Sequence, residues 1–211
     1  MPEGTKQRLD QALVSTGLCD SREQAKRLIL AGEVMLDGHV CDRAATKVAP
    51  DAVLAVRERP RYVGRGGLKL EGALEGFGID PTGLACLDIG ASTGGFTDCL
   101  LQHGAAHVHT IDVGTNQLAW KIRSDPRVVA RERFNARNLT PADIDHTPID
   151  LVVIDVSFIS LTKILPAAFS VLGPEGRIVC LIKPQFELAR HEVGKGGIVR
   201  DDGLRQRAIE T

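Results

Sequence analysis

The sequence predicts an α/β protein in which a doubly wound parallel sheet follows a smaller α+β domain. From residue 66 onward, predicted helices alternate with short apolar strands, which is typical of a parallel sheet covered by helices on both faces. A glycine-rich turn joins one of these strands directly to a helix. Before residue 60, two predicted helices precede short strands, and this change of pattern indicates a separate module.

Composition places the chain among ordinary globular proteins. It has 211 residues, a net charge of -1 and a hydrophobic fraction of 43%, which suffice for a buried core. No apolar run approaches the roughly eighteen residues that a membrane span requires. The opening MPEGTKQRLD lacks the hydrophobic core of a signal peptide. We therefore predict a cytoplasmic protein without a membrane partner.

The five cysteines carry no pairing signal. They are widely spaced and form no C-x-x-C pair: Cys19, Cys41, Cys86, Cys99 and Cys180. Neither a disulfide framework nor a zinc site is therefore indicated, and we predict reduced, mostly buried thiols and no metal.

The N-terminal module is predicted over residues 1–58. Apolar residues at helical spacing predict a first helix around 8–14, and Ser21 is a good N-cap for a second helix. The Asp-Gly pair at 37–38, between two short apolar runs, predicts a hairpin. A further strand is expected at 53–56, before the linker, which is predicted over 59–65.

Four cations of this module are candidates for binding an anionic partner: Arg8, Arg22, Lys26 and Arg27. The last three lie near one another on the helix predicted from Ser21, opposite its apolar stripe. A solvated helix face explains the same spacing equally well, so the spacing alone does not separate the two interpretations.

The second domain is predicted over residues 66–211. Its expected helices are 68–77, a helix from 95, 117–122 and 161–169, and its expected strands are 85–89, 107–111, 128–130, 149–158 and 176–186. In such a sheet, ligands bind at the carboxyl ends of the strands.

The turn between the strand at 85–89 and the helix from 95 is the best candidate for a cofactor loop. Its glycines let the backbone turn tightly and approach a ligand, and the next helix begins with unpaired N–H groups. The pattern reads G-x-S-x-x-G rather than G-x-G-x-x-G, and no Lys-Ser/Thr pair follows, so a P-loop is not indicated. A purely structural turn is the alternative. The candidate contacts are Gly90, Ala91, Ser92, Thr93, Gly94, Gly95 and Phe96.

Two further positions extend this candidate site. Asp112 ends the second apolar strand, where a carboxylate can accept hydrogen bonds from a ribose hydroxyl pair. Asn135 follows the third strand and is a candidate for an adenine edge, with Phe134 available to pack on the base. For Asn135 the alternative is a turn residue that bonds its own backbone. Asp112 alone does not distinguish NAD from S-adenosylmethionine.

Charged residues end two otherwise apolar strands. Asp155 follows LVVI and Lys183 follows IVCLI. Ionised groups there are costly unless they are paired or used in chemistry, so both are candidate catalytic residues; a structural ion pair is the alternative. Lys69, in GRGGLKLEGAL, is by itself typical of a surface lysine on a helix.

The chain as a whole resembles the TlyA family, the hemolysin-named ribosomal RNA 2′-O-methyltransferases. The resemblance is carried, in order, by RLDQALVSTGLCDSREQAKRLILAGEVMLDG, RYVGRGGLKLEGAL, LDIGASTGGFTDCLLQHGA, IDVG, DLVVIDVSFISL and LIKPQFE. It implies a ribosomal-protein-type RNA-binding domain followed by an FtsJ-like class I methyltransferase domain of the Rossmann type. It also implies S-adenosyl-L-methionine as cofactor and ribosomal RNA or ribosomal subunits as partners.

The resemblance assigns catalytic roles as well. FtsJ-like enzymes use a Lys-Asp-Lys-Glu set, whose first three members match Lys69, Asp155 and Lys183. Lys183 is our candidate to take or steer the proton of the ribose hydroxyl, because that hydroxyl does not ionise at neutral pH. Cofactor contacts would fall on residues 90–96, Asp112 and Asn135, and on Asp155 itself.

The fourth family residue, a glutamate, is expected further toward the C-terminus than this sequence extends. Glu187 and Glu210 do not stand in the expected last-strand context, so neither is assigned that role. Residues 201–211 resemble the first two turns of a helix, and we expect the chain to continue beyond them.

Three other functions compete with the enzyme. A non-catalytic RNA-binding or ribosome-associated protein would leave the three polar residues without a role. A membrane-active hemolysin would need an amphipathic segment that the sequence does not show. An NAD-dependent oxidoreductase fits the glycine turn but leaves the N-terminal module unexplained.

Overall fold

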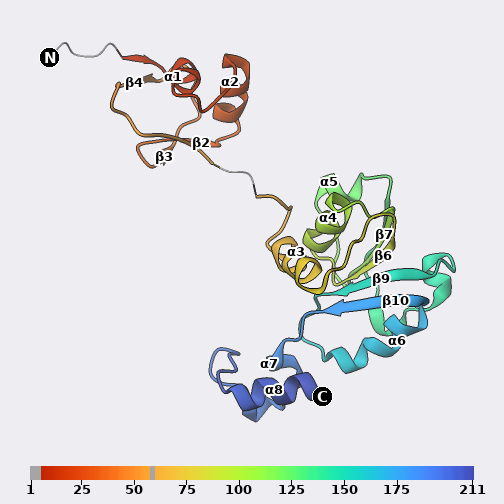
Figure 1. Cartoon of the computed structure of the whole chain (residues 1–211). Helices are drawn as coiled ribbons and strands as arrows, with labels where there is room; N and C mark the ends of the chain where they lie inside the picture. The colour runs from red at the N-terminus through yellow and green to blue at the C-terminus, as the bar shows by residue number, and fades with distance from the viewer. Residues whose placement is uncertain (1–5, 58–59) are drawn as a thin grey trace. The chain divides into compact units, whose positions relative to one another are not determined.

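The computed structural model describes residues 6–57 and 60–211, and the chain divides into a unit Met1–Pro60 and a unit Arg61–Thr211. Figure 1 shows the two units, each with its own helices and strands. Position 59 of the predicted linker lies outside the described residues. Residues 61–65 of that linker belong to the second unit, where the Val63 N–H donates to the Asp98 carboxylate at 2.8 Å.

The first unit packs two helices, α1 (Leu9–Ser15) and α2 (Arg22–Leu30), against short strands. The Ser21 hydroxyl accepts the Gln24 N–H and caps α2, as predicted. The strands are β1 (Gln7–Arg8), β2 (Val34–Leu36), β3 (His39–Val40), β4 (Lys47–Val48) and β5 (Leu54–Val56); they form an antiparallel β1-β4 pair and a sheet of order β3-β2-β5.

The hairpin β2-β3 and the core of this unit follow from the sequence pattern. Asp37 and Gly38 both have positive φ, 49° and 81°, which is the backbone twist that a two-residue hairpin turn requires. The core is built by fully buried side chains from α1, α2 and β2: Leu9, Leu13, Ala25, Ile29 and Val34.

One charged side chain lies within this core. The Asp10 carboxylate is fully buried and pairs with Arg8 Nε at 3.0 Å and Arg22 Nη2 at 2.9 Å. The hydrogen bond from Arg8, assisted by Arg22, lowers the pKa of Asp10 to about 2. The two guanidinium groups are therefore held together at the surface by one buried anion.

The second unit is a five-stranded parallel sheet, which confirms the predicted α/β fold. Its strand order is β10-β9-β6-β7-β8. The strands are β6 (Ala85–Ile89), β7 (His107–Ile111), β8 (Val128–Arg131), β9 (Ile149–Ile154) and β10 (Leu172–Cys180). The three central strands are almost entirely buried, which explains their continuous apolar sequence.

Helices cover both faces of this sheet (Figure 1). On one face lie α3 (Gly66–Phe77), α4 (Gly95–Gln102) and α5 (Trp120–Arg123), packed on Cys86, Val108 and Leu151. On the other lie α6 (Leu165–Ser170) and three short 3-10 turns, η1 (Ala136–Asn138), η2 (Pro141–Ile144) and η3 (Leu161–Lys163), packed on Leu87 and Val152. Alternate residues of each strand thus serve opposite cores.

Two predicted strands end earlier than expected. The prediction of strand at 155–158 is wrong, because the last paired residue of β9 is Ile154, opposite Ile89, after which β6 turns into the glycine loop. The prediction at 181–186 is wrong as well. Pro184 has no N–H for a strand ladder and begins the helix α7 (Pro184–Glu187).

The chain then forms a 3-10 turn, η4 (Arg190–Glu192), and the helix α8 (Asp202–Glu210), whose N-cap is Asp201. The helix predicted near the C-terminus is therefore present. Among the described residues, no helix is long and apolar enough to cross a membrane.

A buried acid lies in the middle of β6. Asp88 is fully buried, and its Oδ2 accepts the Thr97 hydroxyl of α4 at 2.6 Å. Burial raises the pKa of Asp88 to about 7, against the opposing effect of the Thr97 hydrogen bond. The carboxyl group is therefore protonated in the folded protein below neutral pH.

This raised pKa predicts how stability depends on pH. The unfolded chain loses the Asp88 proton near pH 4, whereas the folded chain retains it until about pH 7. Asp88 therefore destabilises the folded state progressively as pH rises from about 4 to about 7, and its effect is constant above that range. The variant Asp88→Asn keeps an oxygen for Thr97 and carries no proton equilibrium. We expect its thermal unfolding midpoint to exceed that of the wild type more at pH 8 than at pH 5. A difference between the two proteins that is constant with pH would contradict the assignment.

Candidate functional site

The strand order creates a switch point between β6 and β9. From β6 the chain builds outward through β7 and β8, and then returns to add β9 and β10 on the other side. At such a point the loops that follow two neighbouring strands run in opposite directions, and a crevice for ligands lies between them at the carboxyl ends of the strands. Gly90, Asp112, Asp155 and Lys183 follow β6, β7, β9 and β10, so the topology brings them to one edge of the sheet.

The glycine loop packs closely against backbone atoms at two positions. Gly90 has a φ of 87°, and a Cβ there would lie 2.8 Å from the carbonyl oxygen of Asp155. At Gly95 a Cβ would lie 3.0 Å from the Gly67 nitrogen and 3.1 Å from the Gly64 oxygen. The loop is thereby fixed against the start of α3 on one side and against the Asp155 backbone on the other.

A polar pocket of about 480 Å³ lies beside this loop. It contains the three charged residues singled out from the sequence. Lys183 Nζ lies 2.6 Å from Asp155 Oδ1, and Lys69 Nζ lies 3.5 Å from Asp155 Oδ2. One carboxylate therefore faces two lysines that come from elements far apart in the sequence, α3 and the end of β10.

A second pocket of about 460 Å³ opens at the ends of β6, β7 and β9. Its walls are largely apolar and include Ile111, Phe134 and Ile164, with Asp112 and Asn135 at its polar positions. The Asp112 carboxylate accepts the N–H groups of Ser92 and Gly114, both at 2.7 Å. It therefore holds the glycine loop to the end of β7.

Asn135 is a turn residue that also lines the second pocket. Its side chain lines the second pocket, and its Oδ1 accepts the Arg137 N–H at 3.1 Å as the cap of η1. It is therefore a turn residue that also faces the pocket. Phe134 lies beside it, with the Arg131 guanidinium 5.3 Å from the ring centre.

The two pockets adjoin. Gly90, Ser92, Asp155 and Ser157 line both of them. Of the seven predicted loop contacts, Gly90 to Thr93, Gly95 and Phe96 line at least one pocket. Gly94 instead faces the protein interior, where a Cβ would lie 2.9 Å from Leu118. A ligand with an aromatic end and a charged end could occupy both pockets at once.

Several residues at this edge were missed by the sequence analysis. Ser157 accepts a hydrogen bond from Lys183 Nζ at 2.9 Å, and Phe158 is 91% exposed with a φ of 65°, a strained conformation for an aromatic residue. The Phe158 ring lies 5.3 Å from that of Phe186. The only sequence signal for them was their place directly after Asp155.

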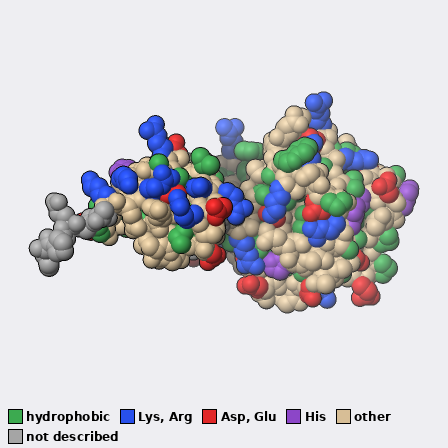
Figure 2. All heavy atoms as spheres, turned by 90° about the horizontal axis from the view of Figure 1, so that it is seen from above, with side chains coloured by type: hydrophobic (Ala, Val, Ile, Leu, Met, Phe, Trp, Pro, Cys, Tyr) green, Lys and Arg blue, Asp and Glu red, His purple; other side chains and the backbone are tan. Residues whose placement is uncertain are grey.

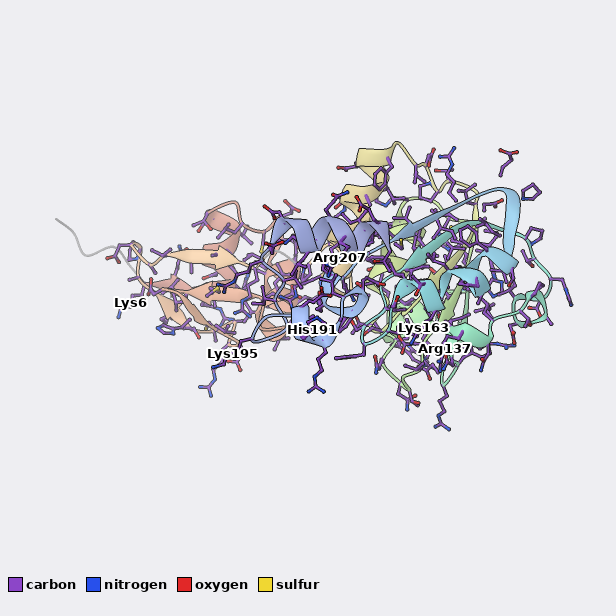
Figure 3. The ribbon with its side chains drawn as sticks, turned by 90° about the horizontal axis from the view of Figure 1, so that it is seen from below. Lys6, Arg137, Lys163, His191, Lys195 and Arg207 are labelled. Atoms are coloured by element: carbon purple, nitrogen blue, oxygen red, sulfur yellow. The ribbon has the colours of Figure 1, made fainter. Side chains whose placement is uncertain are left out.

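A third pocket, of about 470 Å³, lies beyond Phe158 and carries two cations, Arg137 and Lys163. Figure 3 shows both side chains on the same face of the second unit. Arg137 also lines the second pocket, so this basic pocket continues from it. Glu187 fastens this region to the chain after β9: it accepts the Ser160 hydroxyl at 2.5 Å and the Leu161 N–H at 2.9 Å.

The four predicted basic residues of the first unit lie on and beside α2. Arg8 and Arg22 are paired with Asp10, and Lys26 and Arg27 are exposed. Figure 2 shows lysine and arginine side chains gathered on one face of this unit. A local basic face of this kind is what phosphate binding requires.

Comparison with known proteins agrees with both units. Residues 62–211 match the FtsJ-like methyltransferase family, and residues 7–54 match the S4 domain. The chain is 52% identical, over 96% of its length and 76% of the relative, to the 16S/23S rRNA (cytidine-2′-O)-methyltransferase TlyA of Mycobacterium tuberculosis. It is 48% identical to Hemolysin A of Brachyspira hyodysenteriae, over 97% of the chain and 85% of the relative.

Solved structures show the same relationship. A candidate hemolysin from Streptococcus thermophilus superposes with a TM-score of 0.70 and 45% identity, covering 98% of this chain and 76% of the other. A second, from Lactococcus lactis, has a TM-score of 0.70 and 56% identity over 72% of this chain and 73% of the other. The chain therefore belongs to the TlyA, or hemolysin A, family of FtsJ-like methyltransferases.

Proposed function

We propose that this protein transfers a methyl group from S-adenosylmethionine to a ribose 2′-hydroxyl of ribosomal RNA, and that Lys69, Asp155 and Lys183 carry out the transfer. The observation that carries the proposal is the placement of two lysines on one carboxylate, directly beside a glycine loop at the switch point of the sheet. The M. tuberculosis relative is named for 2′-O-methylation of cytidines in 16S and 23S rRNA.

The residues present fit this cofactor. Phe134, Ile111 and Ile164 form an apolar slot for a nucleobase, and Asp112 stands at the end of β7, where a carboxylate binds ribose hydroxyls. Gly90 and Ser92 line both this slot and the polar pocket, so the two pockets suit a ligand whose charged chain extends from its nucleoside. When bound, the cofactor supplies a methyl group on a positively charged sulfur. We assign its contacts to the loop 90–96, Asp112 and Asn135.

The chain's own residues then position the oxygen and manage its proton. Lys183 is the candidate to hold or accept the proton of the 2′-hydroxyl, and it is only about one-fifth exposed in its side chain. Asp155 fixes Lys183 and, more loosely, Lys69. Methyl transfer requires the ribose oxygen, the methyl carbon and the leaving sulfur to lie in line, and much of the rate gain comes from this alignment. The positions of the three side chains therefore matter as much as their basicity.

RNA binding is proposed for two surfaces, each within its own unit. The third pocket combines the exposed Phe158 ring and the half-buried Phe186 ring with two cations, Arg137 and Lys163. Aromatic rings beside cations are the combination that binds single-stranded nucleic acid. In the first unit, Arg8, Arg22, Lys26 and Arg27 are assigned to RNA phosphates.

We propose residues 1–58 as the RNA-binding domain, 59–65 as the linker and 66–211 as the methyltransferase domain. The protein then acts in the cytoplasm on ribosomal subunits.

Removal of the Lys183 amine tests the proposed chemistry. We expect Lys183→Ala to lower transfer of labelled methyl to ribosomal RNA by at least about a hundredfold, because the proton then has no acceptor. Affinity for S-adenosylmethionine, measured by calorimetry with NAD as a negative control, should change less than threefold. Lys195→Ala, at an exposed lysine outside the pockets, is the matched control. Loss of cofactor affinity instead would make Lys183 a binding residue, and binding of NAD alone would replace the methyltransferase with an oxidoreductase.

The basic pocket makes a separate prediction about salt. If Arg137 and Lys163 each neutralise one phosphate, the double variant Arg137→Ala/Lys163→Ala should show a shallower dependence of RNA affinity on salt. We expect the slope of log affinity against log salt to fall by about 0.7 to 0.9 for each phosphate that is no longer neutralised. Arg177→Ala, an exposed arginine of β10 that lines none of the three pockets, should leave the slope unchanged. An unchanged slope in the double variant would remove this pocket from the RNA-binding surface.

A further inference from the structure

The amine of Lys183 has two fixed partners. Asp155 Oδ1 is its ion-pair partner at 2.6 Å, and the Ser157 hydroxyl oxygen accepts its hydrogen bond at 2.9 Å. An amine nitrogen has three directions available besides its bond to carbon. The Ser157 hydrogen bond therefore occupies one of these directions, while the charge of Asp155 attracts the amine from another side without the alignment of a hydrogen bond.

Ser157 is well placed to fix the rotation of the Lys183 amine. It follows Asp155 by two residues, beyond the end of β9, and it lines both the polar pocket and the apolar slot. The backbone that carries it is held by the contact of Gly90, where a Cβ would meet the Asp155 oxygen at 2.8 Å and Val156 at 3.2 Å. The backbone directly before Ser157 is thus closely packed against the glycine loop.

A serine in a turn commonly bonds its own backbone instead. Within residues 6–57 and 60–211, the Ser157 hydroxyl makes its hydrogen bond with Lys183 rather than with a neighbouring backbone group. Lys183 comes from a different strand end, 26 residues later in the sequence. The contact therefore serves the site and not the local turn.

We propose that Ser157 is a positioning residue for methyl transfer: its hydrogen bond, with the charge of Asp155, fixes the rotation of the Lys183 amine so that a free direction of the nitrogen faces the ribose hydroxyl. This inference rests on the proposed function. Without the hydroxyl, the amine rotates about its last carbon–nitrogen bond and spends less time aligned with the substrate. A small misalignment of a reacting group can cost up to about a hundredfold in rate, so a tenfold loss is a moderate expectation.

The test compares Ser157→Ala and Ser157→Thr with the wild type, using ribosomal RNA and S-adenosylmethionine. The single-turnover rate of methyl transfer reports the reaction step, and calorimetry and RNA titration report binding separately. We expect Ser157→Ala to lower the single-turnover rate about tenfold while both affinities stay within twofold. Ser157→Thr retains a hydroxyl and should recover most of the rate. Ser170→Ala, at an exposed serine of α6 away from the pockets, should behave as the wild type.

The outcomes separate the two proposals. Wild-type protein that forms no 2′-O-methyl ribose overturns the proposed function and this inference together. Active wild type with an equally fast Ser157→Ala overturns the role of Ser157 alone. A loss confined to cofactor or RNA affinity also overturns it, because a positioning residue acts on the rate. Failure of Ser157→Thr to exceed Ser157→Ala would show that the hydroxyl is not what matters.

Discussion

The site depends on one shared anion, the Asp155 carboxylate at the end of a buried strand. Its two oxygens face Lys183 at 2.6 Å and Lys69 at 3.5 Å. A carboxylate at the rim of an apolar sheet is costly unless it is paired, and two lysines in one small pocket repel each other unless an anion lies between them. Each group therefore offsets the cost of the others, and the trio brings together side chains from α3 and from the ends of β9 and β10.

The backbone of Asp155 also determines the sequence of the glycine loop. The Asp155 carbonyl oxygen lies where a Cβ at position 90 would be, so position 90 requires glycine. Asp112 then ties this loop to the end of β7 through two backbone N–H groups. The result is an apolar slot and a polar pocket that share four lining residues. A cofactor with a nucleoside at one end and a charged reactive group at the other suits this shape.

The sequence predicted the architecture well because strand and helix periodicity is local. The strands at 85–89 and 107–111 appear with the expected bounds. The sequence also named the three charged residues that the structure brings together, although Lys69 was singled out only through the family resemblance. The end of β9 could not be predicted, because a strand ends where its neighbour turns away, which is a long-range property. Ser157 and Phe158 were missed for this reason, since both were assigned to a strand that had already ended. For β10, Pro184 was a local signal against a strand reaching residue 186.

The most direct test of this account is the chemical identity of the product. The protein is incubated with ribosomal RNA and methyl-labelled S-adenosylmethionine, and the RNA is digested to nucleosides. These are separated by chromatography and fragmented in a mass spectrometer, which shows whether the label is on the ribose or on the base. The account predicts that the label is recovered in 2′-O-methylated ribonucleosides, because the lysine and carboxylate trio is suited to a ribose hydroxyl. Label on a nucleobase, or none in RNA from a protein that binds the cofactor, would contradict it.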